Sequence, residues 1–178
     1  SQFAIQSLGK NDYLFKAALS NQASFQNAII NIAAIGISLN PALKHAYLVP
    51  RSMEKGKPPS VCLDVSYQGL MHLAMQSGGI VWGQAKIVYK NDKYTNNGIG
   101  DYLTEEMDHK SILEVQNASQ AKNGPWKNWW NEMARKTVVK RASKYWPSCD
   151  NVASAIEVIN QHEGINFDEP KDITPPKR

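Results

Sequence analysis

The chain has 178 residues, of which 42% are hydrophobic and 20% charged, with a formal net charge of +4 and a pI near 9.0. These values are typical of one soluble globular domain; no signal peptide is visible, and the longest apolar run, residues 27–39, is too short to span a bilayer. Two cysteines, Cys62 and Cys149, are too few for a disulfide framework and fit a reducing cytosol, and the four histidines lack the spacing of metal ligands, so we expect no structural metal.

The first predicted elements are a buried helix and a β-hairpin. Phe25–Ile37 is apolar and closes at Gly36, and the Pro-containing turn that follows cannot continue a helix. Strand-like runs then occupy His45–Arg51 and Val61–Tyr67, joined by the connector SMEKGKPPS. We expect an antiparallel hairpin with a basic, mobile tip, where Arg51 touches phosphate.

A second helix and a third strand are predicted next. Tyr67–Ser77 has apolar residues at helical spacing and ends at a Gly-Gly pair, which is a strong stop signal. Ile80–Tyr89 alternates well enough for a strand, with Trp82 and either Ile87 or Val88 as its buried anchors. The three strands would form one small sheet.

The middle of the chain is predicted to be a long loop followed by a helix. Lys90–Tyr102 consists almost entirely of turn-forming residues, which is a notable length for a loop in a compact domain. Asp108 is placed to cap a helix that runs to Ser119.

A short helix and an extended tail end the chain. Asp150 or Asn151 caps the helix, whose residues Val152, Ile156 and Ile159 share one face. Residues 163–178 contain three prolines and little apolar content, so we expect them to be extended or disordered. We therefore divide the chain into a core, residues 1–162, and a tail, residues 163–178. The chain also begins with Ser rather than Met, which suggests a trimmed product.

Positive charge is concentrated between Trp126 and Trp146. This stretch, WKNWWNEMARKTVVKRASKYW, holds six of the twenty Lys and Arg residues and one of the sixteen acidic residues, so its net charge is +5 and the remainder of the chain is at −1. A single helix at about 100° per residue would place Lys136, Lys140 and Lys144 on one side and apolar residues such as Val139 on the other. The pattern predicts an amphipathic helix with a cationic, exposed edge.

Three tryptophans precede those lysines. On the same helical wheel Trp126, Trp129 and Trp130 fall on the lysine side, so that indole rings and ammonium groups share a surface. Stacking platforms beside a cationic groove suit single-stranded nucleic acid, although a solvated helix whose tryptophans belong to the core explains the same pattern. The residues predicted to contact DNA are Arg51, Trp126, Lys127, Arg135, Lys136, Lys140, Arg141 and Lys144.

Three segments occur in the order ISLNPALKHAYLVPR, LDVSYQGLMHLAMQSG and GPWKNWWNEMARKTVVKRASKYWP. Together they resemble the phage RecT/Redβ single-strand annealing proteins. That family has a Leu-x-Pro turn before a Tyr-Leu-Val-Pro strand, a Tyr-x-Gly-Leu helix start, and a Trp-x3-aromatic-x2-Met-Ala-x-Lys-Thr-Val helix. The matching positions are Leu39, Pro41, Tyr47 to Pro50, Tyr67, Gly69, Leu70, Trp126, Trp130, Met133, Ala134, Lys136, Thr137 and Val138.

The resemblance implies an α+β fold, with a small, mostly antiparallel sheet packed by several helices. It also implies annealing of single-stranded DNA without covalent chemistry, by a ring or filament of identical copies that uses neither ATP nor another cofactor and does not require Mg²⁺. The implied partners are single-stranded DNA, the annealed duplex, further copies of the chain, and a phage exonuclease or host single-strand-binding protein in the bacterial cytoplasm. Family members usually have additional strands where this chain has only Lys90–Met107, so either the domain is abbreviated or a segment is absent.

Two other functions remain open on the sequence. Asp64 on one predicted strand and Gln84-x-Lys86 on the next resemble the carboxylate…carboxylate-x-Lys site of metal-dependent nucleases. Gln84 stands in place of the second carboxylate, so the positive charge of a divalent ion would be poorly neutralised. A non-annealing protein that only coats single strands would slow the pairing of complementary strands. An annealing assay distinguishes such a coating protein from an annealing protein. Mg²⁺-dependent release of nucleotides would identify a nuclease.

Overall fold

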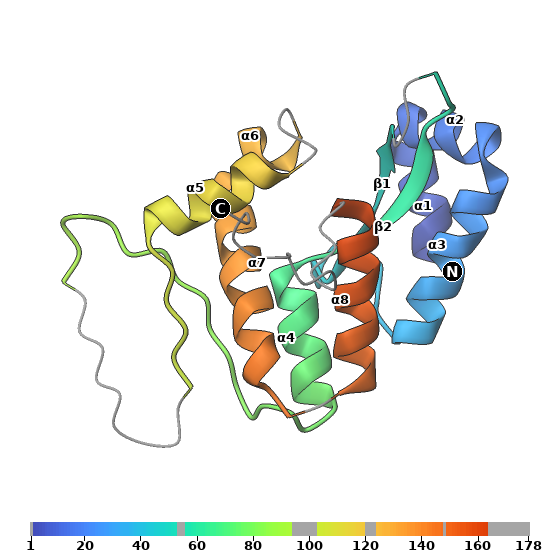
Figure 1. Cartoon of the computed structure of the whole chain (residues 1–178). Helices are drawn as coiled ribbons and strands as arrows, with labels where there is room; N and C mark the ends of the chain where they lie inside the picture. The colour runs from blue at the N-terminus through green and yellow to red at the C-terminus, as the bar shows by residue number, and fades with distance from the viewer. Residues whose placement is uncertain (1, 53–55, 94–102, 120–123, 148, 164–178) are drawn as a thin grey trace, which may run out of the picture.

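The computed structural model describes residues 2–52, 56–93, 103–119, 124–147 and 149–163, and over these ranges the chain folds into helices around one β-hairpin (Figure 1). In chain order the elements are α1 (Gln2–Lys10), α2 (Asp12–Ser20), α3 (Gln22–Ile35), β1 (Ala46–Arg51), β2 (Ser60–Val65), α4 (Tyr67–Gln76), α5 (His109–Ala118), α6 (Pro125–Asn128), α7 (Trp130–Ala142), the 3₁₀ turn η1 (Ser143–Tyr145) and α8 (Asp150–Glu163). The predicted α+β class is confirmed. Within the described ranges, no helix combines the length and apolar character needed to cross a membrane.

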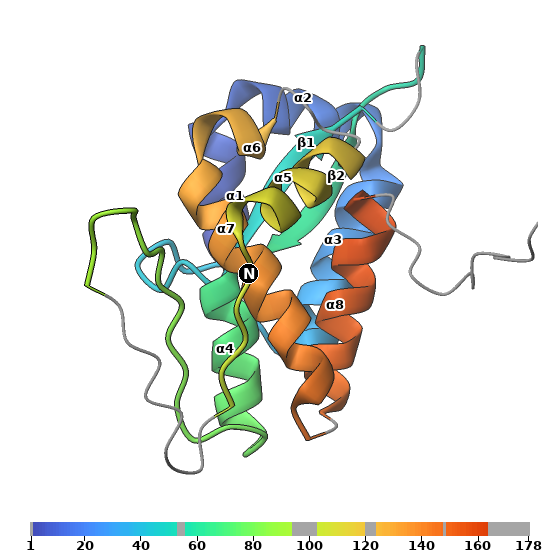
Figure 2. The ribbon, with the colours of Figure 1, turned by 60° about the vertical axis from the view of Figure 1, so that its left-hand side comes forward.

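The hairpin has one apolar face and one polar face. β1 and β2 pair antiparallel in a register that sets Ala46 opposite Val65 and Tyr47 opposite Asp64. Because side chains alternate along a strand, Leu63 and Val65 point to the same face, where both are almost fully buried. α2, α3 and α8 contact β2, and α3 and α8 lie beside the hairpin in both views (Figure 1, Figure 2). The other face carries Tyr47 and Asp64.

Local signals in the sequence place most of the helix ends correctly. Gly36 follows α3 in the left-handed conformation with φ 74°, and Gly78 lies shortly beyond α4 with φ 76°. The Asp108 carboxylate accepts a hydrogen bond from the backbone N–H of Ser111, as the predicted cap of α5 requires. These helices and the hairpin surround the main core, whose largest fully buried side chains are Leu14, Ile35, Leu63, Leu70, Leu73 and Ile159.

Two N-terminal helices, α1 and α2, were not predicted. Their junctions are set by asparagines, because the Asn11 side chain caps α2 and the Asn21 side chain caps α3. Asn21 also donates a hydrogen bond from Nδ2 to Ser60 Oγ at 3.2 Å, and the Val61 backbone N–H donates to Ser24 Oγ at 2.9 Å. The start of α3 is therefore fixed to the start of β2.

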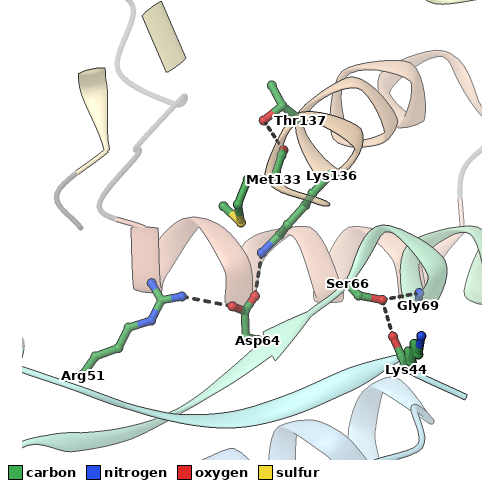
Figure 3. A network of polar contacts seen from close by, with 8 residues as sticks. All are labelled: Lys44, Arg51, Asp64, Ser66, Gly69, Met133, Lys136 and Thr137. Atoms are coloured by element: carbon green, nitrogen blue, oxygen red, sulfur yellow. Dashed lines mark hydrogen bonds and ion pairs between the residues drawn. The ribbon is translucent and has the colours of Figure 1, made fainter. Parts of the chain in front are cut away.

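Gly69 permits the close approach of α4 to the beginning of β1. The Ser66 hydroxyl donates to the Lys44 carbonyl and accepts from the Gly69 N–H, which anchors the first turn of α4 (Figure 3). A Cβ at position 69 would lie 2.3 Å from the His45 carbonyl oxygen. This contact gives a physical reason for glycine in the Tyr-x-Gly-Leu motif.

The predicted third strand is wrong. In the described part of the chain the sheet contains β1 and β2 alone, and residues 80–89 belong to no strand. Trp82 and Val88 are 65% and 48% exposed, so neither is a buried anchor, whereas Ile87 is partly buried. The alternating pattern was not enough to predict a strand, because a strand also requires a neighbour with which to pair. The loop predicted over Lys90–Tyr102 falls largely outside the described residues.

The basic stretch is two helices rather than one. α6 ends at Asn128, and Trp129, with φ −137° and ψ 47°, separates it from α7. α7 then contributes Val139 to the main core and Ala134 to a second, smaller core with Ile112 and Trp126. A helix buried on two sides has less free surface than the predicted amphipathic helix.

The last predicted helix corresponds to α8. Val152 and Ile159 are buried as predicted, and Ile156 is partly buried against the main core. The tail assigned to residues 163–178 lies outside the described residues except for Glu163, the last residue of α8.

Candidate nucleic-acid interface

Asp64 joins the polar face of the hairpin to α7. Its Oδ1 accepts a hydrogen bond from Lys136 Nζ at 2.6 Å, and its Oδ2 accepts one from Arg51 Nη2 at 3.2 Å (Figure 3). The side chain of Asp64 is 16% exposed, that of Lys136 7% and that of Arg51 18%. We call Arg51, Asp64 and Lys136 the Asp64 cluster; it contains two cations and one carboxylate.

Asp64 is ionised at neutral pH despite its burial. Burial alone would raise its pKa, because an ionised carboxylate is poorly solvated inside a protein. The positive charges of Lys136 and Arg51, and the hydrogen bonds that both donate, outweigh this effect and hold the pKa below its usual range. The ionised cluster therefore connects β1, β2 and α7.

Lys136 is not part of an exposed stripe, which corrects the sequence-based expectation. Only 5% of the residue is exposed. Lys136 and Val139 are three positions apart on α7, about 60° around the helix, so both lie on its inward side: Val139 joins the main core and Lys136 reaches Asp64. The lysine is stable there because Asp64 neutralises it. Direct contact between Lys136 and DNA would require it to leave this pair.

The tryptophans do not share one surface with the lysines. Trp126 is 3% exposed and lies in the second core, as the alternative based on core packing expects. Trp130 donates its indole N–H to Gln116 Oε1 at 3.1 Å and packs against the ring of His109. Trp129 is 54% exposed and is the indole of these three that presents most surface to solvent. The break at Trp129 changes the helical phase, so the wheel drawn through all three rings does not apply.

The remaining predicted cations lie along α6, α7 and η1 in different environments. Lys127 and Lys144 are exposed, and Lys140 is half-buried. Arg135 pairs with Glu132 three residues earlier on α7, and Arg141 pairs with Glu105 at 2.6 Å while its side chain stays 50% exposed. The structure therefore keeps part of the predicted basic surface available to a polyanion.

Tyr47 is a candidate site residue that the sequence analysis did not include. It lies directly opposite Asp64 in the hairpin register and is 44% exposed. Burial first, and then the negative charges of Glu132 and Asp64, raise the pKa of its phenol, so the ring is uncharged at neutral pH. An accessible aromatic ring across the hairpin from Asp64 is suited to stacking on a base. The strand's own sequence, AYLVPR, does not identify it, because its place beside Asp64 depends on the hairpin register.

The nuclease alternative required a different arrangement. Both carboxylate oxygens of Asp64 are occupied by basic side chains, and Lys86 lies within residues 80–89, which belong to no strand. Within the described ranges no three His, Cys, Asp or Glu side chains are grouped so that they could hold a metal ion.

Comparisons with known proteins identify one family. The model of the RecT family matches residues 1–102 and 97–175. Protein RecT of Escherichia coli (strain K12) is 30% identical over 176 residues, a match that covers 82% of this chain and 65% of that protein. The chain thus spans slightly less than two thirds of this relative. No solved structure matches the chain significantly.

Proposed function

We propose, because the chain belongs to the RecT family, that it binds single-stranded DNA and anneals complementary strands during recombination. The observation that carries the proposal is the Asp64 cluster, which fixes the basic helix α7 against the polar face of the hairpin beside an accessible tyrosine. In this arrangement α7, which carries the exposed Arg141, is joined to the face of the hairpin on which Tyr47 lies.

Annealing in this protein would depend on geometry rather than on covalent chemistry. Exposed basic groups such as Lys144 and Arg141 would hold phosphates, and the bases would remain free to pair. Because phosphate contacts carry no sequence information, binding would be independent of sequence and steeply dependent on salt. Lys136 would orient α7 and Arg51 from within the Asp64 cluster.

The proposal includes no nucleotide cofactor. The sequence has no Gly-rich loop followed by Lys and Ser or Thr that could cradle a triphosphate, and Gly78-Gly79 ends a helix. Annealing would therefore proceed without ATP and would not require Mg²⁺. Further copies of the chain, an exonuclease and a host single-strand-binding protein are the proposed partners in the bacterial cytoplasm.

A fluorescence annealing assay tests this function. Two complementary oligonucleotides, one labelled with a donor dye and one with a quencher, are mixed with the protein in buffer that contains neither ATP nor Mg²⁺. We expect pairing to be faster than in buffer alone. Slower pairing would indicate a coating protein, and labelled fragments that appear after Mg²⁺ is added would indicate a nuclease; either result would refute the proposal.

A further inference from the structure

An acidic segment lies against the basic helix α7. Residues 103–108, which lead into α5, include three acidic residues, Glu105, Glu106 and Asp108. This acidic segment belongs to no helix or strand, and both ribbon views show it running beside α7 (Figure 1, Figure 2). Negative charge is therefore placed next to the part of the chain in which positive charge is concentrated.

Glu105 makes the contact between the acidic segment and α7. Its Oε1 lies 2.6 Å from Nε of Arg141, and its side chain is 14% exposed, whereas that of Arg141 is 50% exposed. Two residues that follow Glu105 fix the segment, because Met107 packs against the second core and the Asp108 carboxylate caps α5. The fold thus holds the Glu105 carboxylate on Arg141 while half of the arginine side chain stays accessible to solvent.

A phosphate would bind Arg141 in the same way as this carboxylate does. The planar guanidinium group of arginine binds carboxylates and phosphates through the same N–H donors. Under the proposed function Arg141 holds a phosphate, so Glu105 and the DNA backbone compete for one group. Stability gives little reason for the pair, because ion pairs at half-exposed positions contribute little to it and Met107 and Asp108 already fix the segment.

We propose that Glu105 occupies Arg141 in the free protein and is displaced by a phosphate when single-stranded DNA binds. The inference rests on the proposed function and adds the regulation of that site: the acidic segment competes with the strand for α7. Because this competitor is tethered beside Arg141, it recaptures the guanidinium group whenever a phosphate leaves. Glu105 therefore weakens the hold on the strand and speeds its release.

Replacing Glu105 tests the competition. Glu105→Gln removes the negative charge but keeps the size of the side chain and one oxygen that accepts hydrogen bonds. In titrations of a fluorescent oligonucleotide at low salt, we expect its affinity to rise about twofold to fivefold, because no ion pair has to break when the strand binds. Dissociation of the strand, followed by stopped flow, should slow by a similar factor.

Glu157→Gln on α8 is the matched control. Glu157 is exposed, accepts a hydrogen bond from Gln161 of the same helix, and its replacement makes the same change in net charge. We expect this variant to bind the oligonucleotide within about 1.5-fold of the parent, because screening by salt weakens distant charges. Equal gains from Glu105→Gln and Glu157→Gln would show an effect of net charge alone and would refute the proposal.

Dependence on Arg141 is the sharper test. In an Arg141→Gln background the group for which Glu105 competes is absent, so adding Glu105→Gln should change the affinity by less than about 1.5-fold. The same gain in both backgrounds would show that Glu105 does not act through Arg141, and this result would overturn the proposal.

These measurements distinguish failure of the inference from failure of the proposed function, because they use one strand and require no pairing. If Glu105→Gln binds like the parent while the parent accelerates annealing, the competition is refuted and the function stands. If Glu105→Gln gains affinity only when Arg141 is present but the parent does not accelerate annealing, the competition stands and annealing is refuted. If neither the parent nor Glu105→Gln binds a single strand, both are refuted.

Discussion

Asp64 connects two basic residues that lie far apart in the chain. Lys136 is 72 positions from Asp64 in the sequence, and its side chain is more deeply buried than those of Asp64 and Arg51. When one member of such a cluster is removed, a charge remains in a poorly solvated place, and the loss of stability is larger than the net contribution of the pair.

Replacing Lys136 should destabilise the fold. We expect Lys136→Met to lower the free energy of unfolding by about 3 kcal/mol, because Asp64 would keep only Arg51 as a partner. Lys144→Met is the control; this residue is exposed, and its replacement should change stability by about 0.5 kcal/mol or less. Urea unfolding measures both values. Equal values for the two variants would contradict the structural role of Lys136.

The stabilisation from Asp64 should depend on pH. Its pKa in the folded protein lies below the value of about 3.9 expected in the unfolded chain, so the ionised cluster stabilises the fold above that pH and the contribution is lost as the pH falls through the folded pKa. The difference in unfolding free energy between the parent and Asp64→Asn should therefore be largest near pH 5 to 7 and shrink in acid. A difference that stays constant in acid would show that the cluster does not depend on ionised Asp64.

For individual residues, the sequence predicted where positive charge lies along the chain but not how deeply each side chain is buried or what it contacts. Composition shows that Lys136 belongs to a basic stretch, yet its burial depends on a carboxylate in another element. Tyr47 was overlooked for the same reason: its position becomes meaningful only when the hairpin register sets it opposite Asp64.

Among the elements, those with signals in their own sequence were predicted best. Gly36, Gly78 and Asp108 define helix ends by backbone conformation or by a nearby cap, so α3, α4 and α5 follow from a few adjacent residues. The strand predicted over residues 80–89 failed because pairing requires a second segment, which the alternating pattern does not provide. α1 and α2 were missed although Asn11 and Asn21 are ordinary cap residues.

The packing of α4 on the start of β1 predicts the effect of a methyl group at position 69. Gly69→Ala should lower the free energy of unfolding by about 2 kcal/mol, because the new Cβ would overlap a backbone oxygen that cannot move without shifting the strand. Gly9→Ala in α1 is the control: its Cβ meets no atom within 4 Å, and alanine favours a helix, so stability should rise by about 0.5–1 kcal/mol. Thermal or urea unfolding checks both, and a stabilised Gly69→Ala protein would contradict the close approach.

For the molecule as a whole, the distribution of charge matters more than its net value of +4. Each phosphate neutralised contributes about −0.7 to the slope of log affinity against log salt for a single strand. Lys140→Gln and Lys144→Gln should each make this slope shallower by about that amount and weaken binding equally for all sequences. Lys16→Gln, an equivalent charge change on α2, should leave the slope unchanged. Fluorescence titrations from low to moderate salt measure the slopes. If Lys140→Gln and Lys144→Gln both keep the slope of the parent, as Lys16→Gln is expected to, then α7 and η1 do not contact the DNA.

The division of α7 between two cores has a consequence for local unfolding. The second core is small, with Ile112, Trp126 and Ala134 as its buried members, whereas Val139 on the same helix belongs to the main core. Small clusters open at lower free energy than the whole domain, so α5 and α6 should detach while α7 remains folded. In hydrogen–deuterium exchange, the amides of α5 would then exchange well before those of α4. Such opening would expose the Trp126 ring intermittently and give a nucleic acid access to an indole that the closed domain buries.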